Sequence, residues 1–282
     1  MQTDADTPRF VPVEPDRHGN RFWRRPADHR HATNQARVPV VLAELSEVAS
    51  VFPIAFATTG PAPRAVALLR PDPDAPHPWI DPATRRWRGS YLPAALRAHP
   101  FDARPTAGGR LALLVDEASG LLTGAPDAEP FFTRDGHPAA AVREVIGFLQ
   151  QRHASERDTA AAVRLLDAAG VLAPLPATGR VTEAGAAGLE RVVPERLDAL
   201  DEATILRLMR TGALALAHAQ QVSLQHATRD VSGLPPKTSA AADIACTPEA
   251  ASPSLDGFLD AVARARRDEK SIDLAAPGLG PA

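Results

Sequence analysis

The hydrophobic pattern of the chain changes once, near Gly136, and this change constrains the fold more than any other feature. From residue 9 to about 135, short β-branched and aromatic runs are separated by Pro, Gly and Asp, as in strands joined by turns. From 136 to 232, apolar residues recur at helical spacing. Strands and helices do not alternate regularly, so we do not expect a doubly wound sheet. The sequence predicts an α+β fold, with a β-rich N-terminal part followed by a helical C-terminal part.

Short runs of residues in the first part are the candidate strands. A brief helix is expected over residues 42–50, and a turn over 81–87 that joins two strands. The candidate strands are RFVPV, RVPVVL, FPIAFATT, RAVALLR, PWID, RWRGSYL and RLALLVDE.

Three helices are expected in the second part. The spacing of apolar residues predicts one helix over 138–153 and another over 158–169, which Gly170 would end. Asp201 is placed to cap a third, long helix. Gly212 lies inside that third helix and indicates close packing or a kink.

Residues 233–282 form a tail rich in Pro, Ala and Ser, for which we expect disorder and a possible short helix over 254–267. Cys246, the only cysteine, lies in this tail. The sequence therefore offers neither a disulfide within the chain nor a thiolate metal cage. We expect no metal site and no cofactor.

The overall charge gives no reason to expect a polyanionic partner. The chain has 31 Lys and Arg against 34 Asp and Glu, a net charge of −3, and we expect no nucleic-acid binding. Its first residues lack the apolar core of a signal peptide, and no apolar run is long enough to span a membrane. On these grounds we expect a cytoplasmic protein without a membrane span.

Common catalytic motifs are absent from the sequence: there is no GxGxxG, Walker A, GxSxG or HExxH pattern. His29 and His31 form an H-x-H pair in a predicted loop, where solvated side chains are favoured over a metal site. Asp116 and Glu117 follow the apolar run LALLV at a strand end. Adjacent strand residues point to opposite faces, so turn or cap roles are favoured over a catalytic dyad.

Several ordered motifs resemble the bacterial SapC family. They are FPIAF, AVALLR, WID…RWRGSYLPAALRAHPF and LALLVDEASGLL, followed by PFFTRDGHPAAAVREVIGFLQQ and GLERVVPERLDALDEATILRLMRTGALALAHAQQVSL. His18 and Glu44 also stand at places typical of the family. The resemblance covers roughly residues 9–230. It predicts one SapC-like domain over 9–232.

The sequence departs from the family pattern in two aromatic places. Trp79-Ile80-Asp81 replaces an aromatic "LF.D" motif, and His99 stands where the family has Tyr. A tight turn of the family, before Trp87, is replaced by residues 83–86. If these rings formed a ligand platform, its chemistry would differ here.

The resemblance implies an S-layer-related or accessory role, with an unknown protein or peptide partner from a cell-surface or outer-membrane receptor system. It supplies no established catalytic residues. Two hypotheses follow: a non-catalytic protein that binds a peptide, a protein or a small ligand, or an enzyme that modifies a peptide or small molecule near Tyr91–Phe101 and Asp116–Glu117. The candidate site residues are His18, Asp81, Trp87, Tyr91, Arg97, His99, Asp116 and Glu117.

The stretch YLPAALRAHPF, residues 91–101, carries the most specific of these expectations. We expect Tyr91 to end a strand, Pro93 to start one helical turn and Phe101 to anchor the chain after Pro100. Arg97 is the residue in it most suited to function, because a guanidinium binds a carboxylate through two hydrogen bonds. Trp87 and Tyr91 would floor an apolar pocket.

Overall fold

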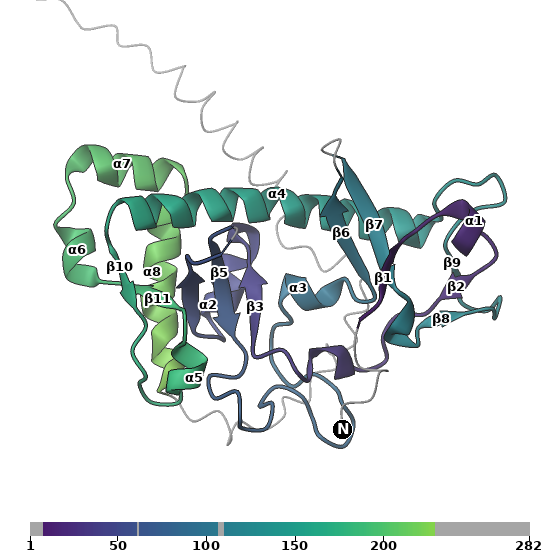
Figure 1. The fold of residues 1–282 in the computed structure, drawn as a ribbon, viewed down its shortest axis with the longest axis horizontal. Helices are drawn as coiled ribbons and strands as arrows, with labels where there is room; N and C mark the ends of the chain where they lie inside the picture. Colours follow the sequence, from purple (N-terminus) through teal and green to yellow (C-terminus); the bar gives the residue numbers. More distant parts are fainter. Residues whose placement is uncertain (1–7, 61, 107–109, 229–282) are drawn as a thin grey trace, which may run out of the picture. The chain divides into compact units, whose positions relative to one another are not determined.

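A computed structural model describes residues 8–60, 62–106 and 110–228, and these form antiparallel sheets in the N-terminal half with helices mainly after it (Figure 1). The predicted α+β fold is confirmed. The sheets have the strand orders β10-β11-β4-β5-β3, β1-β7-β6 and β8-β2-β9. The strands are β1 (Phe10–Pro12), β2 (Phe22–Trp23), β3 (Arg37–Val40), β4 (Ile54–Ala57), β5 (Arg64–Leu68), β6 (Phe101–Pro105), β7 (Leu111–Asp116), β8 (Leu122–Thr123), β9 (Glu129–Pro130), β10 (Leu172–Pro174) and β11 (Glu190–Val192).

Most of the helical residues lie after β9, from Ala140 onward. No helix within the described ranges is both long and apolar enough to cross a membrane. The α-helices are α1 (Pro15–His18), α2 (Leu45–Ala49), α3 (Ala94–Arg97), α4 (Ala140–Ala168), α5 (Glu183–Ala186), α6 (Pro194–Asp198), α7 (Glu202–Arg210) and α8 (Ala213–Ser223). The 3-10 turns are η2 (Arg30–Ala32), η3 (Leu42–Glu44), η4 (Glu117–Ser119) and η5 (Leu224–Ala227).

The prediction of separate helices over 138–153 and 158–169 was wrong, because α4 is one helix of 29 residues. No Pro or Gly interrupts it after Gly147. Its polar middle has a structural use. The Ser155 and Thr159 hydroxyls accept hydrogen bonds from the Ala43 and Leu42 backbone N–H groups, at 3.2 Å and 2.9 Å. These two N–H groups open η3 and have no partner within that turn.

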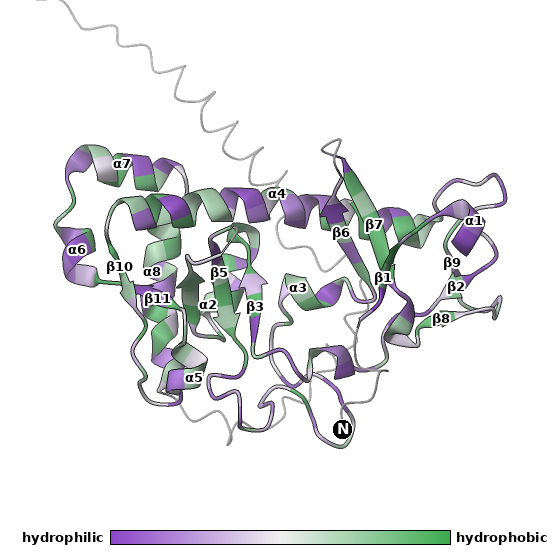
Figure 2. Ribbon diagram, viewed as in Figure 1, coloured by the Kyte–Doolittle hydropathy of each residue, from purple (hydrophilic) through white to green (hydrophobic). Residues whose placement is uncertain are grey.

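Helix α4 serves two hydrophobic cores, one along each half of its length. Its C-terminal half packs Leu166 into a cluster with Phe56 of the five-stranded sheet. Its N-terminal half packs Leu149 into a second cluster with Trp23 and Phe101. Figure 2 shows hydrophobic residues concentrated in strands such as β5 and β7. One rigid helix therefore ties the five-stranded sheet to the two smaller ones.

The second part of the chain also completes the sheet of the first part, which the sequence did not predict. Strands β10 and β11 pair antiparallel, and β11 meets β4 through one residue pair, Glu190 with Phe56. Beyond that pair, Gln220 of α8 connects β4 to β11. Its side-chain amide donates to the Ile54 carbonyl of β4 at 3.2 Å and accepts from the Val192 N–H of β11 at 3.1 Å. The Ser223 hydroxyl accepts from Ile54 N–H at 2.9 Å. These buried side chains replace ladder hydrogen bonds.

Prolines occupy most sheet edges. An edge strand exposes unpaired backbone groups that invite pairing with another chain, and proline removes a donor there. The edge strands β3, β10, β1, β6 and β9 contain, in that order, Pro39, Pro174, Pro12, Pro105 and Pro130. Five of the 28 prolines of the chain thus protect sheet edges, and these edges are poorly suited to strand addition.

Two of the predicted boundary residues, Asp201 and Gly170, are confirmed, whereas Asp158, expected to cap a separate helix, lies inside α4. The Asp201 side chain accepts from Thr204 N–H at 2.9 Å and caps α7, and Gly170, with φ +68°, follows the end of α4. The expected long third helix is broken at Gly212, which has φ +74° and separates α7 from α8. A left-handed residue is strained unless it is glycine.

Some expected strands are absent from the described residues. PWID and RWRGSYL contribute only an isolated bridge between Ile80 and Trp87, and Tyr91 does not end a strand. Phe101 does begin one, β6, which the sequence reading had not identified. The predicted tail, its helix over 254–267 and Cys246 lie outside the described residues.

Candidate functional site

The eight candidate residues fall into two groups. Within the described ranges, no hydrogen bond or ion pair connects one group to the other. The first group lies in the segment from Trp79 to Phe101, which we call the corner, and contains Asp81, Trp87, Tyr91, Arg97 and His99. The second lies where β7 ends beside α1 and contains His18, Asp116 and Glu117.

A buried carboxylate holds the corner in place. Glu44, which is 4% exposed, accepts hydrogen bonds from the Tyr91 hydroxyl at 2.8 Å and from Ala94 N–H at 2.7 Å. The second bond satisfies the start of α3, where Pro93 is the N-cap. Burial raises the pKa of Glu44, while its hydrogen bonds oppose that shift. Glu44 was noted in the family pattern but was not among the candidate site residues.

Arg97 lies on the outside of this arrangement. Its Nη2 donates to the Tyr91 hydroxyl at 2.7 Å and lies 3.7 Å from a Glu44 carboxylate oxygen. The guanidinium carbon sits 5.3 Å from the centre of the Tyr91 ring and 5.5 Å from that of Phe148 on α4. The side chain is 40% exposed. Its other N–H groups make no hydrogen bond within the described residues, so a positioned cation retains free donors.

Trp87 forms the inner wall of the corner. Its Nε1 donates to the Tyr91 carbonyl at 2.8 Å. Its ring stacks on Trp79 with centroids 6.4 Å apart, and Trp79 in turn meets the buried Phe52 edge-on at 5.0 Å. Trp87 and Tyr91 both pack against the main core. They support the position of Arg97 and are only partly accessible.

His99 stacks on His31 at the back of the corner. The ring centroids are 4.0 Å apart and the planes differ by 8°. Burial lowers the pKa of His99 to about 4 and that of His31 to about 3. His31 Nε2 lies 3.3 Å from the Leu96 carbonyl, which assigns the proton to that nitrogen. The pair is neutral at neutral pH, so neither ring is a cationic ligand there.

Asp81 has a turn-forming role. Its carboxylate accepts from Ala83 N–H at 2.9 Å and Thr84 N–H at 2.8 Å, and it also binds the Arg88 guanidinium. These donors lower the pKa of Asp81. Such a turn explains the residue without a ligand.

Asp116 and Glu117 do not form a dyad. Asp116 caps the η4 turn, accepting from Ala118 N–H at 3.0 Å and from Arg9 N–H at 2.7 Å. Glu117 binds Arg17 Nε at 2.7 Å and the Nη2 atoms of Arg17 and Arg9, both at 2.6 Å. The Arg17 hydrogen bonds hold the pKa of Glu117 at about 2. Both carboxylates are occupied by protein donors.

His18 is fully buried and lacks a free lone pair for base catalysis. Its Nδ1 accepts from Glu14 N–H at 3.2 Å, so the neutral ring carries its proton on Nε2. That Nε2 lies 3.7 Å from Glu117 Oε1, and burial lowers the pKa of His18. These contacts favour a structural role for His18.

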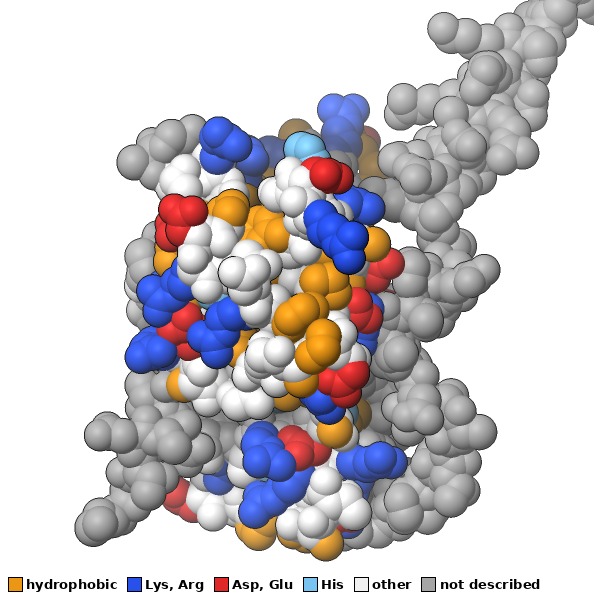
Figure 3. Space-filling view, turned by 90° about the vertical axis from the view of Figure 1, so that its right-hand side faces the viewer, with side chains coloured by type: hydrophobic (Ala, Val, Ile, Leu, Met, Phe, Trp, Pro, Cys, Tyr) orange, Lys and Arg blue, Asp and Glu red, His pale blue; other side chains and the backbone are white. Residues whose placement is uncertain are grey.

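Figure 3 shows the end of the molecule that carries α1: apolar side chains gather in its middle, with charged side chains around them.

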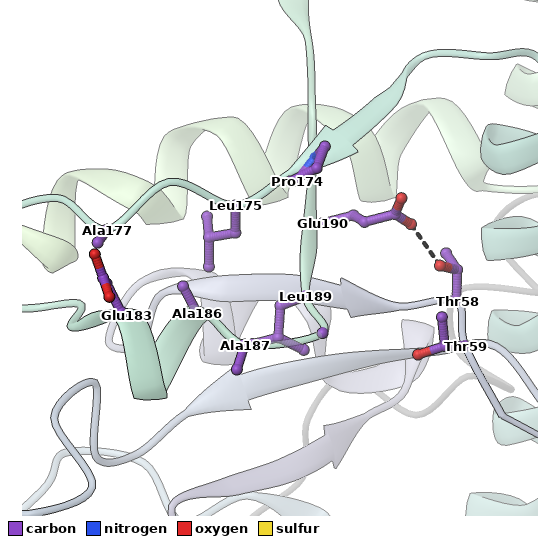
Figure 4. A pocket seen from close by; sticks show the side chains of 11 residues that line it. Thr58, Thr59, Pro174, Leu175, Ala177, Glu183, Ala186, Ala187, Leu189 and Glu190 are labelled. Carbon is purple, nitrogen blue, oxygen red and sulfur yellow. Dashed lines mark hydrogen bonds between the residues drawn. The ribbon is translucent and has the colours of Figure 1, made fainter.

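A cleft that the sequence did not predict lies beside the hairpin turn after β4. It has a volume of about 490 Å³ and is shown in Figure 4. Its lining comes from three separate segments, 58–59, 174–177 and 183–190, and no local motif marks it. The lining residues are Thr58, Thr59, Pro174, Leu175, Ala177, Glu183, Ala186, Ala187, Gly188, Leu189 and Glu190.

The described residues contain no cluster of three or more His, Cys, Asp or Glu side chains suited to a metal ion. A comparison with protein families identifies the family of the chain. The SapC family matches residues 13–229. This chain belongs to the SapC family. The match spans well over half of the chain and contains both the corner and the second group, His18, Asp116 and Glu117. Neither the curated proteins nor the solved structures contain a match.

Proposed function

We propose that this SapC-family protein is an accessory binding protein, S-layer-related as the family resemblance implies, that holds a peptide, protein or small ligand by a carboxylate at Arg97. The observation that carries the proposal is the state of the Arg97 guanidinium. It is fixed by Tyr91 and Phe148, yet it is 40% exposed and keeps free donors. A positioned guanidinium loses little conformational entropy on binding a carboxylate.

The partner class follows from the same chemistry. A carboxylate occurs at the C-terminus of every peptide and on acidic side chains, so a peptide or protein of a cell-surface or outer-membrane receptor system is a suitable ligand. The aromatic rings around Arg97 add apolar contact beside the charge. The proline-bearing sheet edges argue against binding by strand addition.

The alternative is a peptide- or small-molecule-modifying enzyme. It needs the residues near Tyr91–Phe101 and Asp116–Glu117 to meet around a substrate, whereas they form two separate groups. His18 lacks a free lone pair, and Glu117 is bound by two arginines. No observation among the described residues favours this alternative over binding.

The test uses Arg97→Gln, with Arg104→Gln as the matched control. Arg104 also lies over an aromatic ring, Phe10 at 5.8 Å, and is 64% exposed, but it lies outside the corner. The probes are arrayed peptides with free C-terminal carboxylates and the same peptides with amidated ends. Binding is measured by fluorescence anisotropy on the full chain.

We expect a subset of free-carboxylate peptides to bind the wild type and Arg104→Gln alike. Arg97→Gln should weaken binding by about tenfold or more, the effect of losing a charged hydrogen bond, and amidation should have a similar effect. Equal binding to Arg97→Gln, or no preference for the free carboxylate, would reject the proposal. Thermal unfolding verifies that both variants are folded.

A further inference from the structure

The cleft after β4 has an apolar floor that belongs to a core. Leu175, Ala186 and Leu189 are each no more than 8% exposed. They pack in one cluster with Ala55 and Val66 of the five-stranded sheet. A surface supported in this way keeps its shape without a ligand, which lowers the entropic cost of binding. A volume of about 490 Å³ lies within the usual range for small-molecule sites.

Carboxylates stand at the two ends of this floor. Figure 4 shows Glu183 and Glu190 on opposite sides of the row formed by Leu175, Ala186 and Leu189. The Thr58 hydroxyl donates to Glu190 Oε2 at 2.5 Å, which orients that carboxylate and leaves its other oxygen without a hydrogen bond in the described residues. Glu183 is exposed at the first turn of α5.

Among the described residues, neither carboxylate is paired with a cation. No ion pair of Glu183 or Glu190 occurs within residues 8–60, 62–106 and 110–228. Two neighbouring arginines donate to backbone carbonyls and make no ion pair with either glutamate: Arg191 Nη1 to Val192 at 3.2 Å, and Arg37 Nη1 to Ala187, at the cleft lining, at 3.3 Å. A cationic ligand would therefore find two available acceptors without displacing a protein partner.

We propose that this cleft binds a linear aliphatic compound with an ammonium group at each end, a diamine or longer polyamine. Its methylene chain would lie along the apolar floor, and its ammonium groups would contact Glu183 and Glu190. The Thr59 and Thr58 side chains also line the cleft near the Glu190 end. This inference goes beyond the proposed function, because the cleft and the Arg97 corner share no residue and prefer opposite charges.

The experiment is isothermal titration of the full chain with 1,5-diaminopentane, spermidine and, as a single-charge probe, pentylamine. The variants are Glu183→Gln and Glu190→Gln, which keep side-chain size and remove the charge. Glu195→Gln on α6 is the matched control, because it is an exposed glutamate outside the lining. Ala187→Phe tests the same cleft by filling it, since Ala187 is exposed and lines it.

At least one diamine should bind the wild type and Glu195→Gln equally. Pentylamine should bind the wild type about tenfold more weakly than the diamine, because it lacks one charged contact. Glu183→Gln and Glu190→Gln should each bind the diamine about tenfold more weakly for the same reason, and Ala187→Phe should reduce diamine binding similarly. The proposal is overturned if pentylamine binds as well as the diamines, if both Gln variants bind normally, or if no diamine binds at millimolar concentration. Any of these outcomes leaves carboxylate binding at Arg97 unaffected.

Discussion

Glu44 and Glu117 are both glutamates with arginine partners, but their surroundings leave those arginines in different states. Glu44 lies in the interior and takes its short hydrogen bonds from a tyrosine hydroxyl and a backbone N–H, while Arg97 stays 3.7 Å away. Glu117 is bound by Arg9 and Arg17 at 2.6 Å.

The difference shows how an arginine keeps its binding capacity. At Glu117 the guanidinium groups of both arginines are engaged directly with the carboxylate. At Glu44 the neutral donors satisfy much of the carboxylate, so Arg97 is oriented through Tyr91 and retains free donors. The side chains of the two acids are almost equally buried, 4% exposed for Glu44 and 5% for Glu117, so the type of donor that satisfies the carboxylate separates an anchoring network from a candidate binding site.

Loss of the buried acid should have the largest effect on stability. Glu44→Leu leaves the Ala94 N–H and the Tyr91 hydroxyl without their acceptor, and we expect a loss of about 2–4 kcal/mol in the free energy of unfolding. Urea denaturation measures it, with Glu47→Leu as the control because Glu47 is exposed on the adjacent helix. A loss no greater than that of the control would show that Glu44 does not hold the corner.

As the pH falls, the stacked pair His31 and His99 should lose stability at a higher pH than the contacts of Glu117 with Arg9 and Arg17 do. His31 and His99 have pKa values of about 3 and about 4 in the folded chain, against 6.5 ordinarily. As pH falls below 6.5 the unfolded chain binds protons that the folded chain does not, so stability decreases from pH 6.5 down to these values. Each unit of pKa difference corresponds to about 1.4 kcal/mol.

The Glu117 contribution has a lower pH window. Its pKa of about 2 lies below the ordinary 4.5, so its stabilisation is present above pH 4.5 and is lost as pH falls toward 2. The histidine prediction is tested by chemical denaturation from pH 7 to 3. The free energy of unfolding of His99→Tyr should fall less between pH 6.5 and 4 than that of the wild type. Exposed His137→Gln serves as control. An unchanged profile for His99→Tyr would contradict the assignment to the stacked pair.

Replacing one arginine should lower the free energy of unfolding by less than Glu44→Leu does, and by more at the corner than at Glu117. Arg97→Gln removes the hydrogen bond to Tyr91, and we expect about 1 kcal/mol of destabilisation. Arg17→Gln should change stability less, because Arg9 still contacts Glu117. Paired urea titrations compare them. The comparison fails if Arg17→Gln is the more destabilising substitution.

A modest effect is expected from Glu117→Gln, although it weakens the contacts of both arginines. Its partners are exposed arginines, with 69% of the Arg9 side chain and 47% of the Arg17 side chain accessible, so screening by solvent limits the stabilisation. We expect a loss of at most about 1 kcal/mol at neutral pH, reduced further by salt. Thermal unfolding at two salt concentrations measures this. A salt-independent loss as large as that of Glu44→Leu would remove the distinction between the two acids.

The sequence supported the family, the α+β order and several local details, because these depend on neighbouring residues. Asp201 caps a helix, Gly170 follows the end of α4, and Pro93 precedes a helical turn. The break at Gly212 was only partly predicted: a kink was expected, but the left-handed conformation that separates α7 from α8 was not.

The site was less predictable for a physical reason. Arg97 was identified from its chemistry, and the structure leaves it exposed with free donors. The role of Glu44 depends on contacts with residues 47 and 50 positions away along the chain. The cleft is assembled from three distant segments. Such contacts leave no period or motif in the sequence.

By itself the sequence determined the α+β order and some boundary residues, such as the Asp201 cap and Gly170 at the end of α4, since capping residues and glycine act over a few residues. Only the tertiary structure decided how the elements combine. It placed β10 and β11 in the N-terminal sheet, divided α4 between two cores, and separated His18, Asp116 and Glu117 from the corner. These outcomes depend on which apolar faces bury one another and which distant donors satisfy a buried carboxylate, and both are properties of the packed chain.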